Sequence, residues 1–155
     1  MRYILLCICL LSLLGCGIDI KTQQDTKPTT TANEQAKTIQ GQDEHVIAAK
    51  QALSSGNYNK TIEESTIAIN VNANNAEAYS IRGFATALNG DIAKGLIDTK
   101  KAYDLDPNNV ANYYNMAMVY KLQGQLNDSK QWFEKVLEKD PSNTWSVYGI
   151  ATIYA

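Results

Sequence analysis

The chain has 155 residues, of which 45% are hydrophobic and 19% are charged, so it can form one small domain or a short repeat array but not two independent cores. Its 14 Lys and Arg residues and 16 Asp and Glu residues give a net charge of −2. This balance provides no strong positive field to attract nucleic acid, so we do not expect nucleic acid as a partner.

The first 16 residues have the order of an export signal. One cation, Arg2, precedes an apolar run from Tyr3 to Leu14, which is shorter than the roughly 20 residues that a transmembrane helix needs. The end of the run, Leu13-Leu14-Gly15-Cys16, resembles the lipobox of bacterial lipoproteins. This resemblance implies cleavage before Cys16, lipidation of Cys16 and a place in a bacterial cell envelope, outside the cytoplasm. The alternative is an ordinary cleaved signal in which Cys16 has no role.

A polar segment separates this head from the rest of the chain. Residues 17–41 contain six Thr, four Gln and no aromatic residue, so they cannot bury a core and are predicted to be a disordered tether. All three cysteines lie in the head, so the chain beyond Cys16 has no disulfide and no thiolate ligand for a metal. We therefore expect a lipid anchor, a tether, and one folded domain over residues 42–155.

The folded part repeats with a period of 34 residues. The interval separates small or Gly residues in several registers: Gly56, Gly90 and Gly124; Ala49, Gly83, Ala117 and Ala151; Ala68, Ala102 and Val136. Within a unit the apolar residues have helical spacing on both sides of the glycine turn. The pattern predicts a helical hairpin in each unit, with Tyr113, Met116, Ala117, Phe133 and Val136 in the core of the clearest one.

The period and this punctuation resemble the tetratricopeptide repeat. Residues 42–75, 76–109 and 110–143 form three units, and residues 144–155 begin a fourth. The resemblance implies an all-α fold, a right-handed superhelical array of antiparallel helix hairpins with about three units and one extra helix.

Two units depart from the family pattern. The unit 76–109 has Arg82 where the family has Leu and Gly95 where it has Ala, so we expect looser packing there. The unit 42–75 has His45 in place of a core aromatic residue, which favours a packed imidazole over a catalytic one.

The last helix is expected to turn Val147, Ile150, Ala151 and Tyr154 toward the core. No charged residue follows Asp140, so this end of the array would expose an apolar surface. Three explanations are open: the sequence is a fragment of a longer protein, the edge pairs with another copy, or the helix tolerates exposure.

Catalytic and cofactor motifs are not found. The chain has a single His and neither an HExxH motif nor a phosphate-binding Gly-Lys-Ser/Thr loop, so we expect no enzyme activity and no cofactor. The pairs Glu63 with Glu64 and Glu134 with Glu138 are interpreted as solvated charges on polar helix faces rather than as a carboxylate site.

The resemblance also implies a concave groove, lined by the first helices of the units, that binds a peptide or helix of a partner protein. The positions mapped to this groove include Ala111, and the residues expected to bind the partner are Val46, Lys50, Phe84, Leu88, Tyr114, Met118, Lys121, Trp145 and Tyr148. They lack the Lys and Asn cluster with which the chaperone-binding members hold a carboxylate, so a charged C-terminus is not the expected ligand. The sequence therefore predicts a non-catalytic, lipid-anchored scaffold or adaptor of an envelope complex. The alternative is a structural lipoprotein that self-associates through its C-terminal edge.

Overall fold

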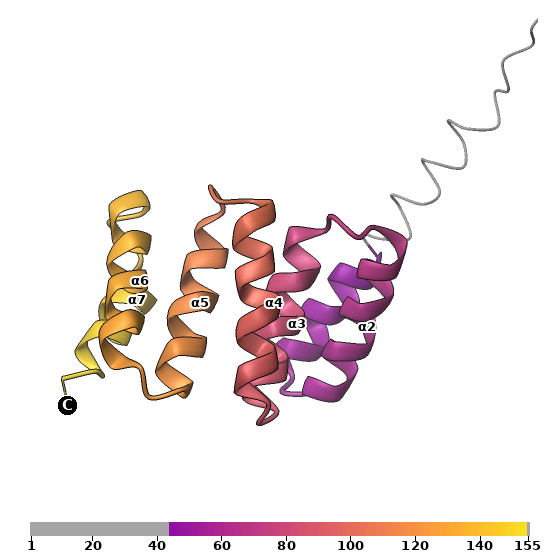
Figure 1. The fold of residues 1–155 in the computed structure, drawn as a ribbon, viewed down its shortest axis with the longest axis horizontal. Coiled ribbons are helices and arrows are strands. Elements are labelled where there is room, and N and C mark those ends of the chain that lie inside the picture. The colour runs from indigo at the N-terminus through magenta and orange to yellow at the C-terminus, as the bar shows by residue number, and fades with distance from the viewer. Residues whose placement is uncertain (1–43, 155) are drawn as a thin grey trace, which may run out of the picture.

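The computed structural model describes residues 44–154, where every regular element is a helix. A first helix over residues 44–54 is followed by α2 (Tyr58–Val71), α3 (Ala76–Leu88), α4 (Ile92–Leu105), α5 (Val110–Leu122), α6 (Leu126–Lys139) and α7 (Thr144–Ala151). The helices follow one another along the long axis of the molecule, with the first helix and α2 at one end and α6 and α7 at the other (Figure 1). The expected order of three helix hairpins and one extra helix is confirmed. Of the described helices, none is long and apolar enough to cross a membrane.

The residues that recur every 34 positions have two structural roles: some cap the start of a helix, and others form the turn of a hairpin. A side-chain oxygen before five of the helices accepts a hydrogen bond from a backbone N–H of the first turn, and these caps are Asn57, Asn75, Asp91, Asn109 and Asn143. The hairpin turns contain Gly56, Gly90 and Gly124, which have φ angles of 74°, 106° and 77°. Glycine adopts this left-handed conformation without strain, so its recurrence marks the turn of every hairpin.

The core of the clearest unit contains the residues that the helical spacing predicted. Tyr113 is 7% exposed, Met116 is 1% exposed, and Ala117, Phe133 and Val136 are completely buried. These side chains come from both helices of one hairpin, α5 and α6, so burial of an apolar stripe on each helix holds the pair together.

The expectation of looser packing in the unit 76–109 is wrong. A Cβ atom on Gly83 of α3 would lie 2.7 Å from the carbonyl oxygen of Gly95 on α4, and a Cβ on Gly95 would lie 2.5 Å from the carbonyl oxygen of Gly83. Such distances are closer than any side chain allows, so the two helices are in backbone contact at this crossing. The two glycines bring the helices together because neither places a side chain between them.

Arg82 is also part of this packing rather than a defect in it. Its Nε donates a hydrogen bond to Asp98 Oδ2 at 2.7 Å and its Nη2 donates one to Asp98 Oδ1 at 2.9 Å. The guanidinium also lies 5.3 Å from the centre of the Tyr79 ring. The hydrogen bond to Asp98 raises the pKa of Arg82. The pair therefore ties α3 to α4 at the position where the family has Leu.

His45 is not packed in the core as expected. Its Nδ1 lies 2.7 Å from Oε2 of Glu64 on α2, and its side chain is 35% exposed. Glu64 is 16% exposed and faces the first helix, so the interpretation of this carboxylate as freely solvated is also wrong. The pair joins the first helix to α2, where complete units use an aromatic side chain.

The face that α7 buries differs from the predicted one. Ser146 and Gly149 are its buried residues, whereas Val147 is 54% exposed and Tyr154 is 70% exposed. A Cβ on Gly149 would lie 2.5 Å from Cζ of Phe133, so α7 packs closely on α6 of the preceding unit. Tyr113, the equivalent of Val147 in the preceding unit, stacks on Trp132 of α6, the second helix of its own hairpin, whereas no helix after α7 is described. Val147 and Tyr154 therefore belong to the exposed apolar surface that was expected at this end.

Candidate binding groove

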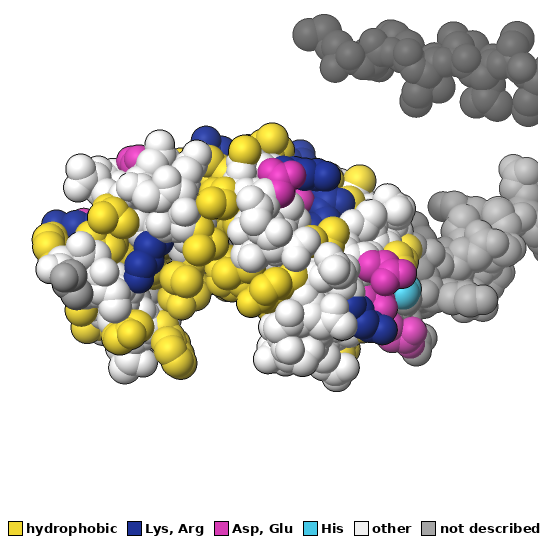
Figure 2. All heavy atoms as spheres, turned by 90° about the horizontal axis from the view of Figure 1, so that it is seen from below, with side chains coloured by type: hydrophobic (Ala, Val, Ile, Leu, Met, Phe, Trp, Pro, Cys, Tyr) yellow, Lys and Arg dark blue, Asp and Glu magenta, His cyan; other side chains and the backbone are white. Residues whose placement is uncertain are grey.

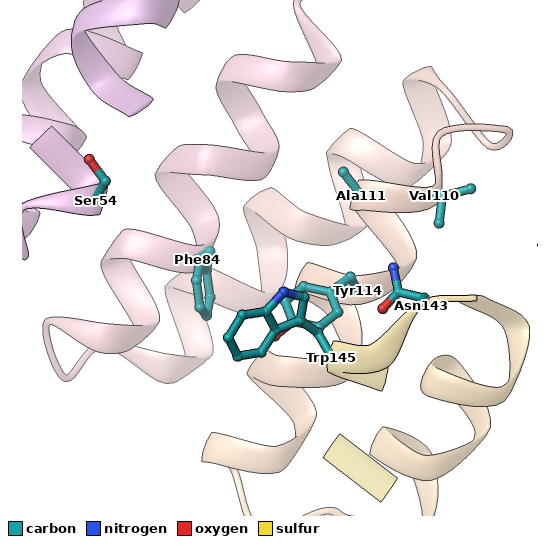
Figure 3. A pocket seen from close by; sticks show the side chains of 7 residues that line it. All are labelled: Ser54, Phe84, Val110, Ala111, Tyr114, Asn143 and Trp145. Carbon is teal, nitrogen blue, oxygen red and sulfur yellow. The ribbon is translucent and has the colours of Figure 1, made fainter. Parts of the chain in front are cut away.

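The concave side of the array is formed by the first helices of successive hairpins. α3 and α5 contact each other directly, although α4 lies between them in the sequence. Phe84 of α3, Tyr114 of α5 and Trp145 of α7 converge there on an open groove of about 870 Å³ (Figure 3). The groove is lined by Ser54, Phe84, Val110, Ala111, Tyr114, Asn143 and Trp145.

The groove is apolar at one side and polar at the other. Figure 2 shows a hollow whose floor and α7 side are mainly hydrophobic, while the lobe at the first helix is mostly polar. Trp145 is 69% exposed on the apolar side. On the polar side the Ser54 hydroxyl donates a hydrogen bond to the backbone carbonyl of Gln51. An elongated ligand therefore meets different chemistry at its two ends.

Among the described lining residues, Tyr114 alone has a phenol group. Its ring packs edge-on against the buried Phe133 ring, with centroids 5.7 Å apart and planes at 63°. Partial burial raises the pKa of the Tyr114 hydroxyl above its usual range. Within residues 44–154 this hydroxyl has no hydrogen-bond partner, so it is a neutral donor available to a ligand.

The two lysines predicted for the groove have neighbours of their own. Lys50 forms an ion pair with Glu77 of α3, and the Lys121 ammonium donates a hydrogen bond to the Thr152 hydroxyl. Neither lysine is among the residues that line the groove. The lining residues that the structure describes therefore carry no charge.

The other predicted groove residues lie in three different environments. Val46 is 5% exposed and belongs to the core between the first helix, α2 and α3, so its assignment to the groove surface is wrong. Leu88 and Met118 are half-buried and do not line the groove. Tyr148 is 65% exposed and lines a second, shallower hollow of about 260 Å³ with Thr144 and Trp145. A role for any of these side chains in binding stays a prediction.

The position rule missed three lining residues, which lie at the ends of helices. Ser54 ends the first helix, Val110 begins α5, and Asn143 is the cap of α7. The mapping of groove positions considers only residues inside the first helices of the units, so it cannot identify residues at helix ends. The cap pattern itself could have identified Asn143, because it recurs at intervals of 34 residues.

The described side chains do not assemble a metal or carboxylate centre. Within residues 44–154 no three His, Cys, Asp or Glu side chains lie close enough together to hold a metal ion. Glu134 and Glu138 are exposed on α6, and Glu134 lies 3.5 Å from Lys130. The predicted Cys16 site and the tether are outside the described residues.

Comparison with known proteins finds a repeat match in part of the chain and the same fold in solved structures. A family model described as tetratricopeptide repeat matches residues 99–131. No curated protein sequence matches the chain. The expected all-α superhelical array is confirmed by the solved structures that resemble it.

Three of these structures illustrate the range of the fold. The first TPR of Spaghetti (RPAP3), solved with the HSP90 peptide SRMEEVD, is 19% identical with a TM-score of 0.68, and the match covers 74% of this chain and 94% of that one. The second TPR domain of human RPAP3, solved with the HSP70 peptide SGPTIEEVD, is 24% identical with a TM-score of 0.62, covering 74% and 98%. An O-GlcNAc transferase mutant from Thermobaculum terrenum is 19% identical with a TM-score of 0.71, covering 75% of this chain but 22% of that one.

Proposed function

We propose that the chain, which has the fold of tetratricopeptide-repeat domains and matches that repeat over residues 99–131, is a non-catalytic scaffold or adaptor that binds a protein partner in its concave groove. The observation that carries the proposal is the convergence of Phe84, Tyr114 and Trp145 on an uncharged open groove. Partly exposed aromatic side chains that converge on a hollow are typical of binding hot spots. Two proteins with the same fold were solved with peptides, which supports a peptide or protein ligand here.

We further propose that the domain is held at a bacterial envelope membrane by lipid on Cys16. The lipobox-like sequence Leu13-Leu14-Gly15-Cys16 supports this anchor, and the polar tether between it and residue 44 supports a domain held near the bilayer. The partner then belongs to a complex of the cell envelope.

Crosslinking in cells tests the groove. We expect the parent chain to capture a partner, and the double variant Phe84→Glu, Tyr114→Glu to lose at least about tenfold of that capture, because two carboxylates would have to be desolvated by the ligand. The readout is the amount of captured partner measured by quantitative mass spectrometry.

The matched control is Ile97→Glu, which introduces the same charge on α4 at a side chain that is 67% exposed and does not line the groove. Circular dichroism and the melting temperature verify that both variants are folded. Equal capture by the parent and the double variant would remove the groove as the functional site.

Cys16→Ser tests the anchor. We expect this variant to lose incorporation of an alkyne-labelled fatty acid and to move from the membrane fraction to the supernatant, because no acyl chain remains to bind the bilayer. Cys7→Ser and Cys9→Ser are the matched controls, since both residues lie in the same head. A Cys16→Ser chain that keeps its label and stays in the membrane fraction would contradict lipidation at this residue.

A second candidate function is self-association through α7. It is favoured by the exposure of Trp145, Val147, Tyr148 and Tyr154, which are 69%, 54%, 65% and 70% exposed. An apolar surface of this kind is typical of an interface. Sedimentation velocity of the chain over a hundredfold range of concentration tests it, with Tyr148→Glu and Tyr154→Glu expected to abolish any dimer. A monomer at every concentration would contradict this candidate.

A further inference from the structure

The groove that we propose as the binding site differs in charge from what an acidic peptide requires. Among residues 44–154, none of those that line it is Lys, Arg, Asp or Glu. Of the two cations predicted for the groove, Lys50 forms an ion pair with Glu77 and Lys121 donates a hydrogen bond to the Thr152 hydroxyl, and neither is a lining residue. A ligand carboxylate placed against Phe84 and Trp145 would lose its hydration without an ion pair from the described lining residues, which is strongly unfavourable.

The size of the groove suits large side chains of the ligand. Its volume of about 870 Å³ lies within the range in which protein pockets enclose a ligand, on the order of 300–1,000 Å³. Phe84 and Trp145 come from helices separated by α5 and present aromatic surface to the same space (Figure 3). An aromatic or large aliphatic side chain between them would bury apolar surface of both rings.

Tyr114 gives the groove a fixed polar contact. Its ring is held against Phe133, which is completely buried, so the position of the hydroxyl is set by the core. Tyr114 lines the groove, and its hydroxyl has no partner within residues 44–154. A backbone carbonyl of a bound segment would satisfy this donor, whereas a ligand without an acceptor there would leave it buried and unpaired.

Resting on the proposed function, we infer that the ligand of this groove is an uncharged protein segment. It inserts an aromatic or large aliphatic side chain between Phe84 and Trp145 and accepts a hydrogen bond from the Tyr114 hydroxyl through a backbone carbonyl. Its apolar part lies toward α7 and its more polar part lies toward Ser54, in keeping with the two sides of the hollow (Figure 2).

A peptide library tests this ligand class. The probe is a mixture of acetylated, amidated ten-residue peptides of random sequence, presented to the full chain in phosphatidylcholine nanodiscs, and the recovered peptides are sequenced. Phe84→Glu measures the background and Ile97→Glu is the matched control. We expect Asp and Glu to be depleted at least about threefold in the recovered peptides and aromatic residues to be enriched.

Two further measurements on the tightest peptide define the contacts. Replacing its aromatic anchor by Asp is expected to weaken binding at least about tenfold. Tyr114→Phe is expected to weaken binding about fivefold, the effect of one neutral hydrogen bond, while circular dichroism of the chain stays unchanged. Unchanged affinity in either case overturns the corresponding part of the inference.

The outcomes separate this inference from the proposed function. Enrichment of acidic peptides, or tight binding of SRMEEVD with its free carboxylate, overturns the uncharged class while the groove remains the binding site. Recovery no better than that of Phe84→Glu overturns both. A dimer that Phe84→Glu dissociates and that peptides do not compete with would make a second copy the occupant, and the inference would be wrong.

Discussion

Gly95→Ala is expected to lower the free energy of unfolding by about 2 kcal/mol, because a Cβ at this position would lie 2.5 Å from the carbonyl oxygen of Gly83 and 2.8 Å from the Cβ of Ala87. The obstacle is backbone, so no rotamer change can relieve it and α3 and α4 must move apart. Alanine is favoured over glycine inside a helix by up to about 1 kcal/mol, and the clash outweighs this gain. Urea unfolding followed by far-ultraviolet circular dichroism measures the difference.

Two comparisons make the result specific. Lys101→Ala, an exposed position of α4, is expected to change stability by less than about 0.5 kcal/mol. Gly83→Ala adds a Cβ at the same crossing, on α3 instead of α4. The loss of unfolding free energy in the double variant with Gly95→Ala should therefore be smaller than the sum of the losses in the two single variants. A Gly95→Ala chain as stable as the parent would show that the helices do not touch at this crossing.

The glycine pair also shows where the sequence pattern stops being informative. The period of 34 residues, the turn glycines and the cap residues predicted the hairpins correctly, because each depends on local backbone chemistry that the sequence contains. Gly83 was interpreted as one of the repeated small residues, and Gly95 was interpreted separately as a departure from Ala. Their effect on packing depends on both lying at one crossing, which a single position in a repeat pattern cannot reveal.

The residues that line the groove were predicted from the sequence only in part. Phe84, Tyr114 and Trp145 were named from their positions in the repeat, and the structure places all three at one hollow. Val46 has the equivalent of a groove position but is buried in the core with Ala49 and Ile81, and its equivalent in the next unit, Ser80, is also buried. Burial at this position depends on the helices that pack around it, which a positional rule does not describe.

Asp98→Ala is expected to destabilise the chain by about 3 kcal/mol, because it leaves the Arg82 guanidinium between α3 and α4 without its partner. The two side chains are 22% and 10% exposed, and two hydrogen bonds of 2.7 and 2.9 Å join them. An exposed pair has a much smaller effect, so Glu134→Ala, which removes the partner of Lys130, is expected to change stability by less than about 1 kcal/mol. Urea unfolding of the three chains gives the comparison.

A double-mutant cycle separates the interaction free energy of the Arg82–Asp98 pair from the destabilisation caused by leaving one of the two charges unpaired. Arg82→Leu introduces the residue that the repeat pattern favours, yet it should be destabilising by itself because Asp98 then keeps a buried, unpaired carboxylate. Arg82→Leu combined with Asp98→Leu replaces both charges by apolar side chains, and we expect it to recover most of the stability lost in either single variant. Losses that simply add in the double variant would show that Arg82 and Asp98 act independently. Recovery of stability in the double variant would show that α3 and α4 pack stably around either an ion pair or two apolar residues. It would also show that only an unpaired charge destabilises their contact.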